Sequence, residues 1–255
     1  MSAATLESRP TLAIRCGNFF FRYRNALFPA VLLALCFGFR PTHLGGSEEL
    51  DALLDAAGLL LALTGQALRI VTIGHVYIIR GGRNRRVYAE GLVTGGMFAH
   101  SRNPLYLGNL LIVLGLFLIH GNQWVWALGV PFFLLAYGTI VAAEEAFLLG
   151  KFGGSYEAYR RDVPRWIPRL RGVRASLEET QFNWRRVVLK EYTSTYTWTA
   201  GAVLLLVIET LAVHSYQERT AYLAALGACL GLLTIGWATA RYLKKSRRLR
   251  SGRAV

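Results

Sequence analysis

The sequence predicts an all-α membrane protein with about six transmembrane helices and both termini on the cytoplasmic side. Of the 255 residues, 53% are hydrophobic, and the mean hydropathy is positive. The hydrophobic residues form long uninterrupted runs, as in helices that cross a lipid bilayer. The basic residues lie between alternate runs, which is typical of loops on one side of a membrane.

Six apolar runs are candidate transmembrane spans. Five of them are clear: 50–79, 105–120, 124–143, 199–214 and 222–242. The first run, 26–39, has only 14 residues, and as a helix it would be about 21 Å long against a hydrocarbon core of about 30 Å. We therefore expect flanking residues to complete this span or the bilayer to thin locally.

The basic residues support an even number of spans. Segments 1–25, 80–104, 143–198 and 241–255 contain 26 of the 29 Lys and Arg residues. Six helices would place all four segments on one side, and short cytoplasmic loops are the ones that collect Lys and Arg. The net charge of +14 therefore indicates contact with anionic phospholipid headgroups. It does not indicate nucleic-acid binding, because no basic stripe with stacking aromatic residues lies outside this pattern.

Cellular location and metal content are constrained by simple features. Residues 1–25 contain no compact apolar stretch followed by a cleavage site, so no removable signal peptide is expected. Arg (25) far outnumbers Lys (4), which favours a bacterium with a GC-rich genome and hence the inner membrane. The three cysteines are scattered and no histidine pair has metal-ligand spacing, so we predict no disulfide framework and no metal site.

The spans divide the chain into three parts. Residues 1–80 contain an N-terminal tail and two helices. Residues 81–170 contain a cytoplasmic loop, a helical hairpin and a second cytoplasmic segment. Residues 171–255 contain an amphipathic linker, a second hairpin and a basic tail. We expect short amphipathic helices throughout 144–198.

Two polar residues lie inside the second span. Arg69 and His75 are on different faces of the predicted helix. Ionisable side chains within an apolar span usually face the protein interior or a cavity. Both residues are therefore candidates to line a cavity near the cytoplasmic end of this span.

The first polar motif lies where the third span begins. Proline favours the first helical turn and disfavours a helical residue before it, so Asn103 is predicted as the N-cap and Pro104 as the first helical residue. The unpaired amides of this helix end can bind a carboxylate or phosphate, and Gly96 and Gly108 allow close backbone approach. The structural alternative is a capped transmembrane helix whose Arg102 reaches a lipid phosphate.

The second motif is the carboxylate pair Glu144 and Glu145. It follows an apolar helix where the helix dipole disfavours negative charge, and no basic residue within four positions offsets it. An acid beside the membrane indicates a functional site with a cationic partner, for which Arg102 is a candidate. The alternative is a pair of solvated carboxylates just outside the bilayer.

The third motif is the aromatic and basic stretch 151–168. The glycines at 153–154 break the preceding helix, and Ser155 can cap a short helix on which Tyr156, Tyr159 and Arg160 share one face. Such a helix can form part of a pocket or serve as an interfacial anchor.

Together, GGMFAHSRNPLYLG, the hairpin, the pair EE and FGGSYEAYRRDVPRWIP resemble the isoprenylcysteine carboxyl methyltransferase and phospholipid methyltransferase superfamily of integral membrane enzymes. The resemblance covers about residues 90–170 and implies S-adenosylmethionine as cofactor. It implies substrate or catalytic roles for Arg102, Glu145 and Arg160. The cofactor-binding residues that it implies are Gly96, Asn103, Pro104, Tyr106, Gly108, Glu144, Glu145 and Tyr156.

Two departures from the family pattern bear on the acceptor. Asn103 stands where the carboxyl methyltransferases have His, and His100, earlier in the same loop, is a candidate to replace it as a cofactor ligand. The chain also continues well beyond the motif, through the second predicted hairpin to the basic tail. This hairpin either covers the lipid site or serves another purpose.

The chemistry leaves several functions open. Methyl transfer is an in-line displacement that depends on positioning and desolvation, so it needs neither a metal nor a covalent nucleophile. A carboxylate acceptor on a lipid or lipidated molecule could be oriented by Arg102 or Arg160, whereas a phospholipid amine would need a base such as Glu145. The alternatives are a sterol reductase, which resembles this pattern but is much longer, and a non-catalytic lipid-binding protein. The oligomeric state is not determined by the sequence.

Overall fold

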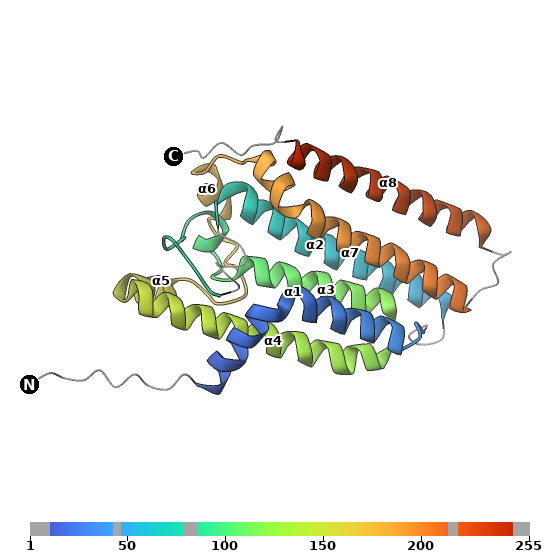
Figure 1. Cartoon of the computed structure of the whole chain (residues 1–255), viewed down its shortest axis with the longest axis horizontal. Helices are drawn as coiled ribbons and strands as arrows, with labels where there is room; N and C mark the ends of the chain where they lie inside the picture. The colour runs from blue at the N-terminus through green and yellow to red at the C-terminus, as the bar shows by residue number, and fades with distance from the viewer. Residues whose placement is uncertain (1–10, 43–46, 79–85, 214–218, 247–255) are drawn as a thin grey trace, which may run out of the picture.

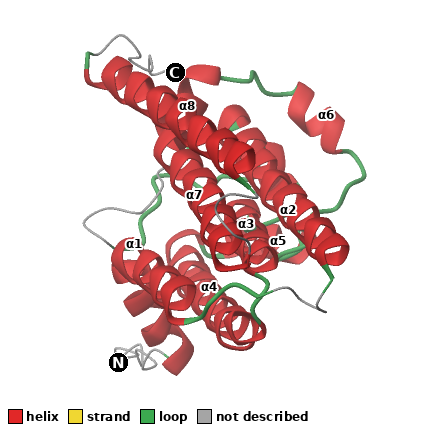
Figure 2. Ribbon diagram, turned by 90° about the vertical axis from the view of Figure 1, so that its right-hand side faces the viewer, coloured by secondary structure: helices red, strands yellow, loops and turns green. Residues whose placement is uncertain are grey.

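A computed structural model describes residues 11–42, 47–78, 86–213 and 219–246. These residues form helices without a β-strand, which confirms the all-α prediction (Figure 2). A short 3-10 helix, η1, covers Gly96–Ala99. The α-helices are α1 (Leu12–Gly38), α2 (Glu48–His75), α3 (Pro104–His120), α4 (Gln123–Phe152), α5 (Gly154–Asp162), α6 (Val173–Glu178), α7 (Trp184–Val213) and α8 (Thr220–Lys245).

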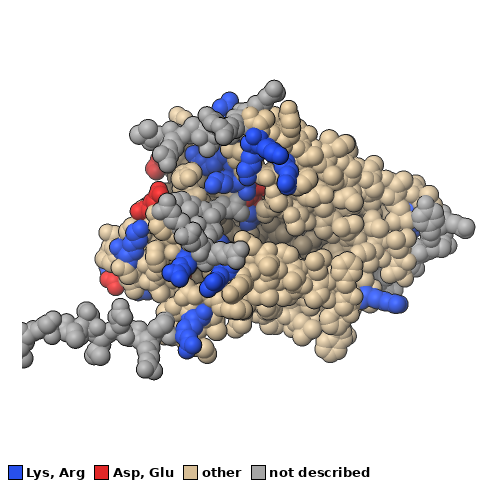
Figure 3. All heavy atoms as spheres, in the orientation of Figure 1, with Lys and Arg blue, Asp and Glu red and all other residues tan. Residues whose placement is uncertain are grey.

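The long helices lie side by side and alternate in direction, with α5 and α6 at one end of the bundle (Figure 1). Helix α1 packs on α4, α2 packs on α3, and α8 lies on the outside against α7. Helix α1 begins and α8 ends at the end that carries α5 and α6. The Lys and Arg side chains visible in Figure 3 gather mostly at that same end.

Five helices are long and apolar enough to cross a membrane: α1, α2, α4, α7 and α8. The sixth, α3, is equally apolar but has 17 residues, or about 25 Å of helix. Six spans are therefore consistent with the described part of the chain. The weak first span is resolved because α1 has 27 residues and starts at Leu12, well before the predicted 26–39.

The prediction of short amphipathic helices throughout 144–198 is wrong at both edges. Helix α4 continues to Phe152, and α7 already begins at Trp184. Only α5, α6 and their loops match the prediction. The reason is that polar residues do not end a helix when packing and backbone hydrogen bonds continue, so the helices extend beyond their apolar parts.

The turn between α3 and α4 is set by two adjacent residues. Gly121 has φ of +68°, a left-handed conformation that favours glycine, and its N–H donates to the carbonyls of Phe117 and Leu118 at 3.2 Å. The side chain of Asn122 then accepts from Trp124 N at 2.8 Å and caps α4. Because one cap ends α3 and the other begins α4 directly after it, the chain reverses direction in a tight hairpin, as predicted.

Glycines allow α2 and α3 to approach closely at two levels. A Cβ atom on Gly65 would lie 2.5 Å from the carbonyl oxygen of Gly108, and one on Gly115 would lie 2.4 Å from that of Gly58. Only glycine fits where two helix backbones are this close. The contact fixes α2 against the helix that carries the Asn103–Pro104 motif at its start.

We expect Gly65→Ala to lower the thermal unfolding midpoint of the purified protein in detergent, because the added methyl group meets a backbone atom. The cost of such overpacking is about 1–3 kcal/mol. Gly138→Ala is the matched control, since no atom lies within 4 Å of a Cβ at this helical glycine. That variant should melt at the wild-type temperature or above. Equal midpoints for the two variants would contradict the close α2–α3 contact.

Candidate functional site

A cavity of about 900 Å³ opens at the basic end of the bundle and extends between the helices. Its walls come from all six long helices, from α5 and from the loops 77–78 and 87–103. Figure 3 shows a hollow between the two halves of the molecule, bordered by Lys and Arg side chains. The polar lining residues include Arg24, Arg69, Arg102, Asn103, Tyr106, Asn109, Glu144, Glu145, Tyr156 and Tyr159.

Glu145 forms ion pairs with two arginines from different segments. Its Oε1 lies 3.1 Å from Arg102 Nη1, and its Oε2 lies 3.1 Å from Arg165 Nη2. The Arg102 and Glu145 side chains are 10% and 15% exposed, so this pair is only weakly screened by water. The sequence predicted the Arg102–Glu145 partnership, and the structure brings the two residues together.

Several atoms of this ion-pair group are buried and have no hydrogen-bond partner among the described residues. They are Arg102 Nε and Nη1, Glu145 Oε1 and Arg165 Nε. The Arg102–Glu145 contact thus has the distance of an ion pair without the alignment of a hydrogen bond. Buried polar groups in proteins normally have partners, so the group is suited to bind a ligand with both charged and hydrogen-bonding atoms.

Glu144 faces a second polar chain on the α1 side of the cavity. The Tyr106 hydroxyl donates to Glu144 Oε1 at 2.7 Å, and Arg24 Nη1 donates to the Tyr106 oxygen at 2.8 Å. Three helices, α1, α3 and α4, contribute these side chains. Successive helical residues point about 100° apart. Glu144 and Glu145 therefore contact different parts of the cavity wall.

The loop before α3 is bound to the segment after α5 by backbone atoms. Arg102 N–H donates to Pro164 O at 2.9 Å, and Arg169 N–H donates to His100 O at 3.1 Å. The Ser101 hydroxyl adds a bond to Trp166 O at 2.8 Å. Two segments that are far apart in the sequence therefore form one surface, on which Arg102 and Arg165 can both reach Glu145.

Asn103 and Pro104 begin α3 as predicted, at the N-cap and the first helical position. The Asn103 side chain does not cap the helix; its Nδ2 donates to Arg165 O at 3.0 Å instead. Both residues line the cavity. Asn103 thus connects the helix start to the segment that carries Arg165.

Four predicted site residues do not line the cavity: Gly96, His100, Gly108 and Arg160. Both ring nitrogens of His100 are engaged, with Arg169 O at 2.8 Å and Ser176 Oγ at 2.9 Å. Gly108 lies in the α2–α3 contact, and the side chain of Arg160 is exposed. Gly96 takes φ of +58°, and a Cβ there would lie 2.7 Å from Val76 Cγ2.

The two tyrosines of α5 line the cavity from the basic end. Tyr156 is 1% exposed, and burial together with the charge of Glu145 raises its pKa. Burial likewise raises the pKa of Tyr159, whose hydroxyl donates to Phe98 O at 2.8 Å. Both side chains are therefore neutral phenols at physiological pH and can only donate or accept hydrogen bonds.

A buried ion pair connects the second hairpin to the cavity wall. Arg69 Nε and Nη2 donate to the two oxygens of Glu191, each at 2.9 Å, and Nη2 also donates to Ser194 at 3.1 Å. Arg69 additionally contacts Asn109 Oδ1 on α3. Arg69 was a predicted lining residue, and it lines the cavity, whereas its fellow candidate His75 does not and bonds Thr180 Oγ1 at 2.8 Å.

Sequence reasoning missed Arg24, Arg165 and Glu191. Arg165 lies between two prolines within the resembling segment, so its place in the motif was a usable signal. Arg24 and Glu191 lie in stretches not predicted to be transmembrane helix. Only the longer α1 and α7 bring Arg24 to the cavity and Glu191 to Arg69.

Parts of the chain are similar to known proteins. The model of the phospholipid methyltransferase family matches residues 55–155. A protein-S-isoprenylcysteine O-methyltransferase of Schizosaccharomyces pombe is 31% identical over 153 residues, which are 60% of this chain and 60% of that protein. The chain is therefore similar to isoprenylcysteine and phospholipid methyltransferases over part of its length.

Two further relatives are similar to a smaller share of the chain. The Rattus norvegicus protein-S-isoprenylcysteine O-methyltransferase is 32% identical over 49% of this chain and 44% of its own length. The cobalt-zinc-cadmium resistance protein CzcN of Cupriavidus metallidurans is 33% identical over 44% of this chain and 50% of its own. The chain thus spans about half the length of the curated relatives it matches. No solved structure matches it.

We expect Glu191→Leu to lower the free energy of unfolding by about 3–5 kcal/mol, because it leaves the Arg69 guanidinium buried without its carboxylate. Denaturant titration in detergent would measure this loss. The double variant Arg69→Met/Glu191→Leu should recover most of the stability, since an apolar pair can replace a buried ion pair. A double variant no more stable than Glu191→Leu would contradict this account.

Proposed function

We propose that the protein is an integral membrane methyltransferase that moves a methyl group from S-adenosylmethionine to a lipid-like acceptor, with an isoprenylcysteine-type carboxylate as the leading candidate. The observation that carries the proposal is the ion-paired Glu145, held by two arginines at the wall of a large cavity. The reaction class comes from the methyltransferases to which the chain is similar.

The cavity's charges suit this cofactor. Its sulfonium and ammonium groups are cations, and Glu144 and Glu145 both line the wall. Its carboxylate is an anion, which can bind the Arg102 Nε, unpartnered among the described residues, and the amides at the start of α3, which no side chain caps. When bound, the cofactor supplies an electrophilic methyl group. The protein residues need only bind, orient and exclude water.

A carboxylate acceptor fits the basic residues at the cavity mouth. Lys190 and Lys244 are exposed lining residues, and Arg102 lies deeper in the same cavity. A carboxylate is already ionised at neutral pH, so its oxygen can attack without losing a proton to a protein base. We propose that Arg102 orients this oxygen, while the apolar lining of Phe21, Phe28 and Ile112 receives part of the lipid.

A phospholipid amine is the second candidate, favoured by the description of the matching family model. An amine must lose a proton, and the available bases are Glu144 and Glu145. Both oxygens of Glu145 lie beside arginine nitrogens and one oxygen of Glu144 accepts from Tyr106. These contacts fit anchoring better than proton removal, which is why we place the carboxylate first.

The active end is proposed to face the cytoplasm, in a bacterial inner membrane. The support is the gathering of Lys and Arg at the end where the cavity opens, as expected of cytoplasmic loops (Figure 3). Anionic headgroups would contact these side chains.

Membranes that contain the wild-type protein should transfer label from methyl-labelled S-adenosylmethionine to a lipid-extractable product. In Glu145→Gln the amide keeps the shape but loses the charge that holds Arg102, so we expect labelling to fall at least about 100-fold, in line with the loss of a positioning interaction. Glu157→Gln on the exposed face of α5 is the matched control and should label normally.

Calorimetry of the purified protein with S-adenosylmethionine separates binding from turnover. Binding with labelling supports the enzyme. Binding without labelling of any lipid extract indicates a non-catalytic lipid-binding protein, and an absence of both would refute the proposal. Undiminished labelling in Glu145→Gln would remove Glu145 from the site.

The bond formed distinguishes the two acceptor classes. A methyl ester releases its label as volatile methanol in mild base, whereas an N-methyl group stays with the lipid. We expect the labelled lipid to lose its label in base, because the cavity favours a carboxylate. Retention of the label, with a methylated amine found by mass spectrometry, would establish the alternative acceptor.

A further inference from the structure

Helices α2 and α7 run antiparallel and meet with one fixed register. Arg69 of α2 pairs with Glu191 of α7 near the cavity. Asp51 precedes Arg69 on α2 by the same number of residues as Glu209 follows Glu191 on α7. This separation is about five helical turns, so the same two faces meet again at the opposite end of the bundle. There the facing residues are both acids.

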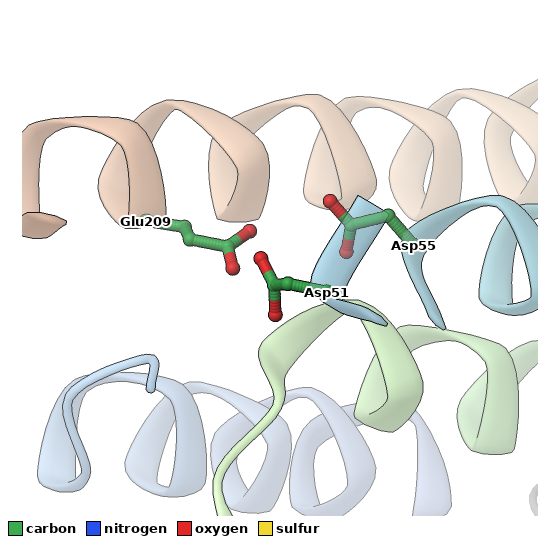
Figure 4. A group of neighbouring side chains, drawn as sticks. All are labelled: Asp51, Asp55 and Glu209. Atoms are coloured by element: carbon green, nitrogen blue, oxygen red, sulfur yellow. The ribbon is translucent and has the colours of Figure 1, made fainter. Parts of the chain in front are cut away.

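A third carboxylate joins them. Asp55 lies one turn from Asp51 on the same face of α2, and Glu209 reaches toward both from α7 (Figure 4). One carboxylate oxygen from each residue lies within 4.8 Å of the others. Asp51 and Glu209 are only 7% and 5% exposed. Two of the three acidic groups are thus largely removed from water, and Asp55 is half-buried.

Glu209 carries the strongest sign of a ligand. Its Oε1 is buried and has no hydrogen-bond partner among the described residues, and the side chain points toward Asp51. A buried polar oxygen without a partner costs free energy, and neighbouring ionised carboxylates repel one another strongly in a low dielectric. A cation among the three groups would remove both penalties.

We propose that Asp51, Asp55 and Glu209 bind one divalent metal ion, a site that the spacing of cysteines and histidines did not predict. Three carboxylates offer only oxygen ligands, the donor set preferred by Mg²⁺, Ca²⁺ and Mn²⁺. The ion joins α2 to α7 at the end opposite the Arg69–Glu191 pair, so that each end of this helix pair has a charge-compensated contact. The site lies away from the methyl-transfer cavity and is independent of the proposed activity.

The test is a titration of metal-free purified protein with Mn²⁺ in detergent near pH 7.5. Electron paramagnetic resonance measures the free Mn²⁺ at each step, and the difference from the added amount gives the bound Mn²⁺. We expect about one Mn²⁺ per chain in the wild type. Glu209→Gln and Asp51→Asn should each weaken binding at least about tenfold, because each replaces a charged carboxylate ligand by a neutral amide. Glu49→Gln, an exposed acid at the same end of α2, is the matched control and should bind like the wild type.

Retained binding of S-adenosylmethionine or an unchanged thermal midpoint without Mn²⁺ would show that the variants are folded. The wild-type measurement also tests the proposal without any variant. No bound Mn²⁺ in the wild type would overturn it and indicate that the three carboxyls share protons instead. Binding that survives in both Glu209→Gln and Asp51→Asn would overturn it as well, by placing the ion elsewhere.

Discussion

The paired charges of Arg102, Glu145 and Arg165 are the constraint on which the site depends. Glu145 belongs to α4, Arg102 to the loop before α3, and Arg165 to the segment after α5. Partly buried charges are costly unless they are paired, so these three segments stabilise one another only in this arrangement. The backbone bonds between Arg102 and Pro164 and between Arg169 and His100 fix it further.

The same physical rule extends along the bundle. In an apolar surrounding, a charge is tolerated where a partner of opposite charge meets it, as Glu191 meets Arg69. That contact explains how the second hairpin, which lies beyond the family motif, packs against the core and contributes Lys190 and Ser194 to the cavity wall. At the far end the same two helices instead bring together three acids, Asp51, Asp55 and Glu209.

The sequence predicted the helices and the start of α3 correctly, but not the lengths of all helices or the contacts of His100. Apolar runs and the alternation of basic segments predicted the helical bundle, and the Asn103–Pro104 step predicted the start of α3. Helix lengths were underestimated at α1 and α7, because their polar ends are held by packing that a hydropathy pattern does not contain. His100 lay within the motif but bonds Arg169 and Ser176, since its loop is shaped by a segment distant in sequence.

The class of fold, the motif and the central pair of Arg102 and Glu145 could all be predicted from the amino-acid sequence. Periodicity, hydropathy and local capping depend on neighbours a few residues away, so they can be read along the chain. The tertiary structure was needed to show that Arg24 lines the cavity, that Arg165 pairs with Glu145, and that Glu209 meets Asp51. These contacts depend on the register between helices, which is set by close packing such as that of Gly65 on Gly108 rather than by any local pattern.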